Sequence, residues 1–326
     1  MPPTSQTATT DRFGDPGKEN SFNHDEKNYV VRKRIMKLRT ALTHLTQQLA
    51  HLYEAPSTTH HNAYWLLEKI TQLSATNLFA QLDSYELTPL QEQNLTAYIH
   101  QLVHENKPLQ YIIGLIPFGN LSLYIEPPVL IPRPETEAWC MALVQQLHEL
   151  PAQPKIIIDL CTGSGCIALT LAHAFPQSTV YAVDIQPQAI ALTQKNIQLN
   201  SITNCIPVLS DLYQAVPVVA ADLIVSNPPY LSKDEWEAVE PHIKNWEDAR
   251  ALIAEDNGLS LIKKIIQKAP SFLQKHTSPT YPQLWIEIGS TQAQTVVQLF
   301  TENNFSSVTV MRDINNHDRV IAGVYV

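Results

Sequence analysis

The chain has 326 residues, enough for a full-size hydrophobic core and a smaller second domain. Its apolar fraction of 44% is ordinary for a globular protein, and no apolar run is long enough to span a bilayer. The formal net charge of −9 argues against direct binding to nucleic acid, because that affinity comes from clustered Lys and Arg.

The N-terminal sequence lacks the apolar segment of a signal peptide, and its acidic residues are unlike a mitochondrial transit peptide. The cysteines form no C-x-x-C pair and no metal-ligand spacing. We therefore expect reduced thiols, no metal site and a cytoplasmic location. The cysteines are Cys140, Cys161, Cys166 and Cys205.

The first hundred residues divide into a tail and a helical domain. Residues 1–28 are polar and without periodicity, which is typical of a disordered tail. Apolar residues recur at helical spacing in residues 35–49, and Thr88 followed by Pro89 marks the start of another helix. Residues 29–107 are predicted to be a small helical domain. Because this domain contains no chemistry-bearing motif, we expect it to recognise the substrate.

The next segment, residues 108–135, has short β-type runs, alternating apolar residues and many prolines. This composition predicts a β-hairpin linker that leads into an extended loop. The alternating residues are Leu121, Leu123 and Ile125.

From residue 136 to 326, short apolar runs alternate with helical patterns. The runs of buried-strand type are KIIIDL, TVYAVD, CIPVLSD, DLIVSNPPY and LWIEIG. This alternation predicts an α/β fold with a doubly wound, Rossmann-like sheet. Two final runs, SSVTVMRD and RVIAGVYV, flank the polar turn INNHD and predict a C-terminal antiparallel hairpin.

A glycine-rich loop follows the first strand of this sheet. The strand ends at Asp159, and Gly163 and Gly165 let the backbone turn sharply and approach a ligand. The spacing D-x-x-x-G-x-G matches a dinucleotide site only weakly, and no lysine follows for a triphosphate. The pattern suits S-adenosylmethionine better. Asp159 would orient either the loop or the ammonium group of this ligand; a turn without ligand is the alternative.

Two more acids close the following strands. Asp184 stands where doubly wound folds place an acid against ribose hydroxyls, and Asp211 could accept a hydrogen bond from an adenine amino group. Each could instead be a helix-capping aspartate. Their positions at consecutive strand ends on one sheet edge favour a ligand site.

The fourth strand ends in Asn227, Pro228, Pro229 and Tyr230. A planar amide or aniline-like nitrogen is a poor nucleophile because its lone pair is conjugated. The Asn227 side-chain oxygen and the Pro228 carbonyl can each accept one N–H of a substrate NH2 group. The prolines restrict the backbone and so aim both acceptors, while Tyr230 offers a flat face. The pattern favours methylation of such a nitrogen over a simple Pro-Pro turn.

These motifs resemble the HemK/PrmC family of protein-glutamine N5 methyltransferases. The resemblance covers residues 30–326 and rests on DLCTGSG, SNPPY and FGNLSLYIEPPVLIPRPETE. NPPY alone is also similar to motifs of DNA adenine and RNA guanine methyltransferases. The segment LIPRPETE favours the branch that acts on release factors, through its residues Pro134, Glu135, Thr136 and Glu137.

The resemblance implies methyl transfer from S-adenosylmethionine to the glutamine side-chain nitrogen in the Gly-Gly-Gln motif of a peptide-chain release factor. We expect the enzyme to be a monomer. It places the catalytic role on Asn227, Pro228 and Tyr230. The implied cofactor contacts are Cys161, Thr162, Gly163, Ser164, Gly165, Asp184, Asp211, Leu212, Asn227 and Phe118. The implied substrate contacts are Asn227, Pro228, Pro229, Tyr230, Arg133 and Glu135.

Three residues depart from the family pattern. Cys161 and Cys166 replace small residues and should be tolerated, whereas Asp248 replaces the usual proline after Glu247 and leaves the local loop shape open. Two other functions remain as alternatives. A nucleic-acid methyltransferase would share NPPY but needs a basic groove, and a non-catalytic binding module would not need Asn227 and Asp184 intact.

Overall fold

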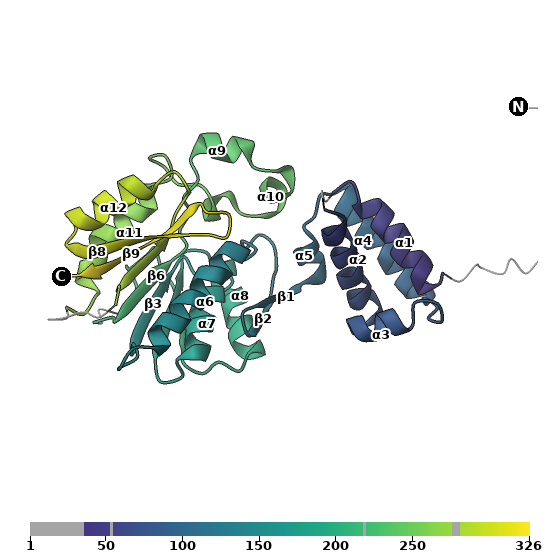
Figure 1. Ribbon diagram of the computed structural model, residues 1–326, viewed down its shortest axis with the longest axis horizontal. Helices are drawn as coiled ribbons and strands as arrows, with labels where there is room; N and C mark the ends of the chain where they lie inside the picture. Colours follow the sequence, from purple (N-terminus) through teal and green to yellow (C-terminus); the bar gives the residue numbers. More distant parts are fainter. Residues whose placement is uncertain (1–35, 53–54, 218–219, 276–280) are drawn as a thin grey trace, which may run out of the picture. The chain divides into compact units, whose positions relative to one another are not determined.

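The computed structural model describes residues 36–52, 55–217, 220–275 and 281–326 (Figure 1). The predicted tail, residues 1–28, lies outside this part, as do the first residues of the predicted helical domain. The helices that begin the described chain are α1 Leu38–Leu49, α2 Pro56–Thr71, α3 Ala75–Ala80, α4 Pro89–Val103 and α5 Leu109–Ile113.

The predicted apolar stripe holds these helices together, because Leu38, Leu45 and Leu49 on α1 are fully buried in their shared core. Thr88 caps α4 as predicted: its hydroxyl accepts from the Gln91 backbone, and the Gln91 side chain accepts from the Thr88 backbone. The domain boundaries at residues 29, 108 and 136 stay predictions.

A two-stranded antiparallel sheet follows, formed by β1 Leu115–Phe118 and β2 Leu121–Tyr124. Asn196 in helix α8 (Pro187–Leu199) and Asn200, the residue that caps its C-terminus, bond to the backbone of β2. Asn200 accepts from Ser122 N–H (3.2 Å) and donates to its carbonyl (2.7 Å), and Asn196 does the same with Tyr124 (2.7 and 3.1 Å). The buried Asn196 amide also donates to the Ser164 carbonyl at 2.9 Å, which connects this hairpin to the glycine loop.

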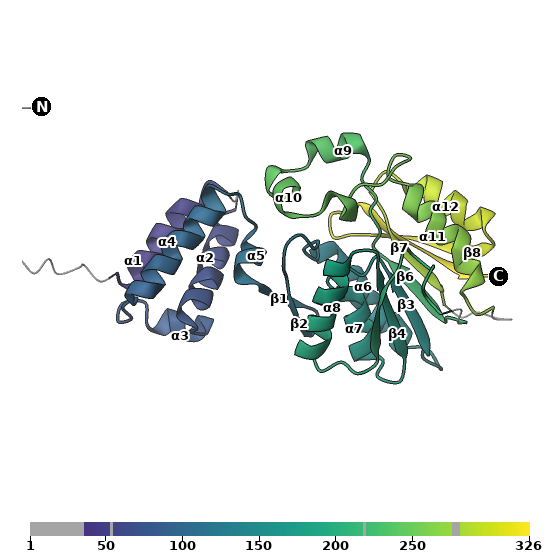
Figure 2. The same cartoon turned by 180° about the vertical axis from the view of Figure 1, so that it is seen from behind.

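The main sheet has seven strands in the order β5-β4-β3-β6-β7-β9-β8. Figure 2 shows β7, β6, β3 and β4 side by side. The first five are parallel, and β9 pairs antiparallel with both β7 and β8. The strands are β3 Ile156–Leu160, β4 Thr179–Asp184, β5 Cys205–Leu209, β6 Leu223–Ser226, β7 Leu284–Glu287, β8 Phe305–Arg312 and β9 Asp318–Tyr325.

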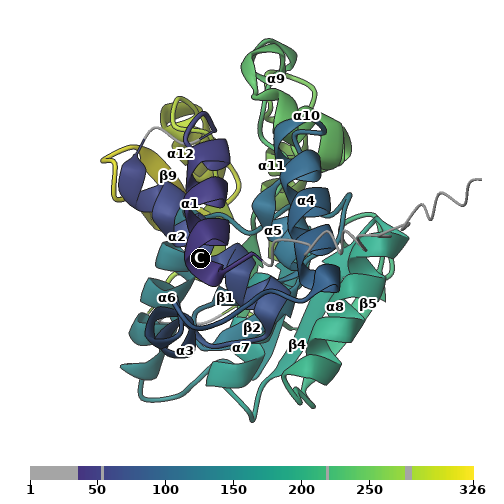
Figure 3. The same cartoon turned by 90° about the vertical axis from the view of Figure 1, so that its right-hand side faces the viewer.

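Helices cover both faces of this sheet. Alternate residues of β3 pack in opposite directions, with Ile157 and Ile158 in different core clusters. One cluster includes apolar residues of α6 and α7, and the other includes those of α11 and α12. Helix α8 packs on β4 and β5 (Figure 3). The helices of this part are α6 Pro134–His148, α7 Cys166–Ala174, α8 Pro187–Leu199, α9 Lys233–Ala238, α10 Pro241–Trp246, α11 Ser260–Lys268 and α12 Ala293–Glu302, with short 3-10 turns η1 Ala249–Ala251 and η2 Ala269–Ser271.

The doubly wound sheet with a closing antiparallel hairpin and preceding helices confirms the predicted fold class. The strand order reverses between β3 and β6, and such a reversal leaves a crevice at the carboxyl ends of the strands. Among the described helices, none combines the length and the apolar character that crossing a membrane requires.

Candidate functional site

A cavity of about 250 Å³ lies at this reversal, at the carboxyl ends of β3 to β6. Each of these strands is followed by residues that line it. The residues are Cys161 and Gly163 after β3, Asp184, Ile185 and Gln186 at the end of β4, Ser210, Asp211 and Leu212 after β5, and Asn227 and Pro229 after β6. Val129, Leu130, Val183, Ala189, Arg250, Ala251 and Leu261 complete the wall.

The glycine loop takes its shape from left-handed backbone and from a buried carboxylate. Cys161, Gly163 and Gly165 have φ values of 60°, 58° and 84°. Asp159 is fully buried and accepts from the Thr162 hydroxyl at 2.6 Å and from the backbone N–H at the start of α7 at 3.1 Å. Burial raises the pKa of Asp159 to about 7. Of its two proposed tasks, the contacts support orienting the loop.

Some predicted loop residues face the cavity and others support it. Thr162 and Ser164 are 3% and 2% exposed, and they are not among the described residues that line the cavity. At Gly165 a Cβ atom would lie 3.0 Å from Thr193, which is tighter than ordinary packing. Burial raises the pKa of the Cys161 thiol, so this departure from the family pattern places a neutral group in the wall.

Asp184 joins the loop to the next strand. Its Oδ2 accepts from Gly163 N–H and its Oδ1 from Gln186 N–H, both at 2.9 Å. The side chain is 9% exposed and lines the cavity, and burial raises its pKa. Asp211 also lines the cavity and accepts from the Gln214 side chain at 3.0 Å.

Ile185 and Arg250 line the cavity although the sequence did not point to them. Ile185 is 59% exposed and lines the cavity. The sequence signal that could have identified it is an apolar residue directly after Asp184, the acid predicted to bind ribose. Arg250 pairs with Asp248 at 2.7 Å, and Asp248 also accepts from the Arg250 backbone at 2.8 Å. The Asp248 N–H, which a proline at this position would lack, donates to the Pro128 carbonyl at 2.9 Å. The aspartate in place of the usual family proline therefore has bonding partners through both its backbone and its side chain.

The Asn227 side chain is held by one end of its amide. Its Nδ2 donates to the Thr136 hydroxyl at 3.1 Å, and that hydroxyl donates to Glu287 Oε2 at 2.7 Å. Because the nitrogen is occupied in this way, Oδ1 is the end of the amide left to accept. Pro228 and Pro229 follow in buried positions.

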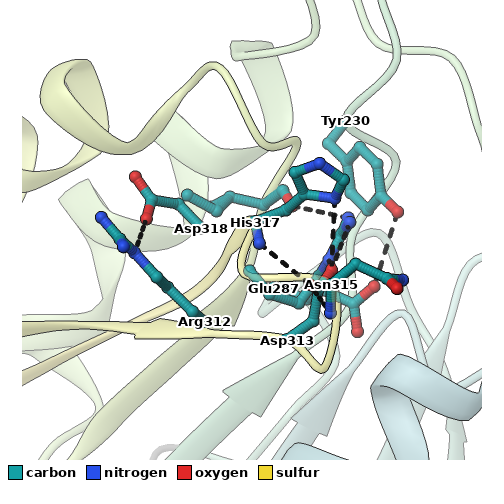
Figure 4. A network of polar contacts seen from close by, with 9 residues as sticks. Tyr230, Glu287, Arg312, Asp313, Asn315, His317 and Asp318 are labelled. Atoms are coloured by element: carbon teal, nitrogen blue, oxygen red, sulfur yellow. Dashed lines mark hydrogen bonds and ion pairs between the residues drawn. The ribbon is translucent and has the colours of Figure 1, made fainter.

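Tyr230 lies against the same buried carboxylate. Its hydroxyl is turned toward Glu287 Oε1 at 3.5 Å, as Figure 4 shows. Burial raises the pKa of Glu287, while hydrogen bonds from Trp139 and Thr136 oppose that rise. Arg319 donates to the carbonyl of Ile288, the residue after Glu287. Arg319 also pairs at 3.0 Å with Asp313, which lies in the turn between β8 and β9.

The remaining predicted residues lie outside the cavity wall. Arg133 forms a two-bond pair with buried Glu247 at 2.8 and 3.0 Å. Glu135 lines a separate hollow with Trp139 and Arg319. Phe118 is 1% exposed in the core and is not among the described residues that line the cavity, so its cofactor contact stays a prediction.

Arg133→Met should lower the free energy of unfolding by roughly 3 kcal/mol, because it leaves Glu247 buried without its partner. Burial already raises the pKa of Glu247, and losing Arg133 removes the main effect that opposes this rise. The variant should therefore lose the full amount of unfolding free energy above the pKa of its folded Glu247. This loss should shrink as the pH falls through that pKa, because Glu247 is then protonated. Urea unfolding across pH measures this, and Arg133→Met with Glu247→Gln should recover part of the loss. A deficit independent of pH would contradict the assignment.

The family models and the curated relatives indicate the same family. The family model "Methyltransferase small domain" matches residues 140–281, and the model "PrmC N-terminal domain" matches residues 40–114. A release factor glutamine methyltransferase of Francisella tularensis is 35% identical, covering 84% of this chain and 94% of its own length. The protein of the same name from Escherichia coli is 33% identical, covering 86% of this chain and 98% of its own length. A solved release-factor-specific protein-(glutamine-N5) methyltransferase from Alicyclobacillus acidocaldarius is 27% identical, with a TM-score of 0.35 over 62% of this chain and 98% of that one.

Proposed function

The chain belongs to the family of release factor glutamine methyltransferases, and on that premise we propose that it methylates the N5 nitrogen of the glutamine in the Gly-Gly-Gln motif of a release factor. The observation that carries this proposal is the Asn227 amide at the cavity wall, tied through its nitrogen and left with its oxygen as an acceptor. A glutamine side chain offers the matching pair of N–H donors.

The lining of the cavity supports S-adenosylmethionine as the methyl donor, which would supply an electrophilic methyl group. Asp184 is a nearly buried carboxylate that suits ribose hydroxyls, and Asp211 suits an adenine amino group. Exposed Ile185 gives the wall an apolar surface suited to the flat adenine ring. The glycine loop brings backbone rather than side chains toward the cavity at Gly163.

Catalysis would come from positioning. Asn227 Oδ1 and the Pro228 carbonyl would each accept one N–H of the substrate amide and aim the nitrogen at the methyl carbon. When bound, S-adenosylmethionine would supply the methyl carbon for in-line attack by this nitrogen, with S-adenosylhomocysteine as the leaving group. The nitrogen is then cationic and acidic, so its extra proton can pass to water without a dedicated base. Tyr230 would lie against the planar amide.

Methyl transfer from radiolabelled S-adenosylmethionine to a purified release factor tests this function. Label should appear on the intact protein and not on a variant whose Gly-Gly-Gln glutamine is replaced. DNA and RNA serve as controls for the nucleic-acid alternative, and cofactor binding without transfer to any of them would favour the binding module.

Residues 29–107 are proposed to recognise the release factor. Removing them should leave cofactor affinity unchanged, because the described cavity is lined by residues from Val129 onward. Methylation of intact release factor should fall at least tenfold, since the protein contacts would be lost. Calorimetry and transfer assays on the truncated chain measure both quantities, with circular dichroism as the folding control. Equal activity would contradict this role. Removing residues 1–28 alone should change neither quantity.

A further inference from the structure

The two ends of the Asn227 amide differ little in size, so packing alone cannot decide which end faces the substrate. Only the oxygen suits a substrate nitrogen that carries two protons. If the amide turned over, its NH2 group would meet the N–H donors of the substrate. The hydrogen-bond partners behind Asn227 must therefore decide its orientation.

The hydrogen bonds behind Asn227 all donate toward Glu287. Trp139 Nε1, which can only donate, donates to Glu287 Oε2 at 2.7 Å. The Thr136 hydroxyl also gives its proton to Glu287 Oε2, at 2.7 Å, in a buried setting. Its oxygen then has only lone pairs to offer on its other side. At that point it can receive Asn227 Nδ2, which lies 3.1 Å away, but not Asn227 Oδ1.

The Glu287 carboxylate also lies near the hydroxyl of Tyr230, the last residue of the NPPY motif. Glu287 Oε1 lies 3.5 Å from the Tyr230 hydroxyl (Figure 4). Glu287 is 1% exposed and stands at the end of β7, while Thr136 is 1% exposed in the first turn of α6. Two rigid elements thus supply the support for Asn227, and neither residue is among the described ones that line the cavity.

We propose that Thr136 and Glu287 are positioning residues for the transfer, which fix Asn227 with Oδ1 turned to the substrate nitrogen. This rests on the proposed function, and neither residue needs to touch the substrate. Glu287 fixes the direction of the Thr136 hydroxyl, and that hydroxyl fixes the Asn227 amide.

A matched pair of variants at position 136 tests the proposal. Thr136→Val keeps the shape but removes the hydroxyl, and Thr136→Ser keeps the hydroxyl but removes a methyl group. Transfer to release factor should show kcat reduced at least tenfold in Thr136→Val and within threefold of wild type in Thr136→Ser, because small misplacements at a reacting centre are costly. The Kd for S-adenosylmethionine and the KM for release factor should change less than threefold in both.

A second measurement separates positioning from stability. In an Asn227→Ala background, Thr136→Val should cause no further loss in single-turnover rate, since the amide that it orients is gone. A further loss as large as in the wild-type background would overturn the proposal. So would near-normal kcat in Thr136→Val, or equal losses in the valine and serine variants that follow their melting temperatures. A wild-type chain that binds the cofactor but transfers nothing would instead overturn the proposed function, and this proposal with it.

Discussion

Asn227→Ala should lower methyl transfer to release factor by roughly two to three orders of magnitude, while the affinity for S-adenosylmethionine changes only slightly. The variant removes the acceptor for one substrate N–H but leaves the glycine loop and Asp184 in place. Losing one hydrogen-bonding group that is aimed at a reacting centre costs roughly 10²- to 10³-fold in rate. Single-turnover transfer and calorimetry measure the two quantities. Near-normal turnover would refute the mechanism and make NPPY only a turn.

Asn227→Asp is the sharper variant at this position. It keeps an accepting oxygen of the same size but loses the N–H that binds Thr136, whose own proton is committed to Glu287. Two acceptors would then face each other. We expect activity between those of the alanine variant and the wild type. It should increase as the pH is lowered, because a protonated aspartate can donate to Thr136 again.

Asp184→Ala should weaken S-adenosylmethionine binding by roughly 10- to 150-fold for each ribose bond lost, which corresponds to about 1.5–3 kcal/mol per bond to a charged group. The variant also removes the acceptor of Gly163 N–H, so the glycine loop loses one of its supports. Asp184→Asn is the matched control, since it keeps one accepting oxygen and should lose less. Calorimetry with unchanged affinity in Asp184→Ala would remove this residue from the site.

The sheet and its motifs were predictable because they are local. A buried strand, a glycine loop and a helix leave a continuous pattern from Ile156 to Ala174. The final hairpin is also local, because its two strands are separated only by a short polar turn. The segment between β6 and β7 was harder. Its helices α9 and α10 have six residues each, too few for a periodic apolar pattern to be distinctive.

Pairings distant in sequence were not predictable from one chain. Thr136 and Glu287 are 151 residues apart, and Arg133 and Glu247 are 114 apart. Glu287 could be placed at the end of a strand, but nothing in a single sequence says which hydroxyl or indole reaches it. The sequence also could not separate the two tasks considered for Asp159, since both need a carboxylate at the same strand end.

The two asparagines beneath β2 have a consequence for association between molecules. A strand at the edge of a small sheet usually exposes N–H and C=O groups to which a strand of another chain can add. At Ser122 and Tyr124 both groups are already bonded to Asn200 and Asn196. An incoming strand would have to displace two side-chain amides, one of them fully buried, before it gained any bond at these residues. The hairpin is therefore protected from aggregation along this edge without a proline or a charged residue within β2.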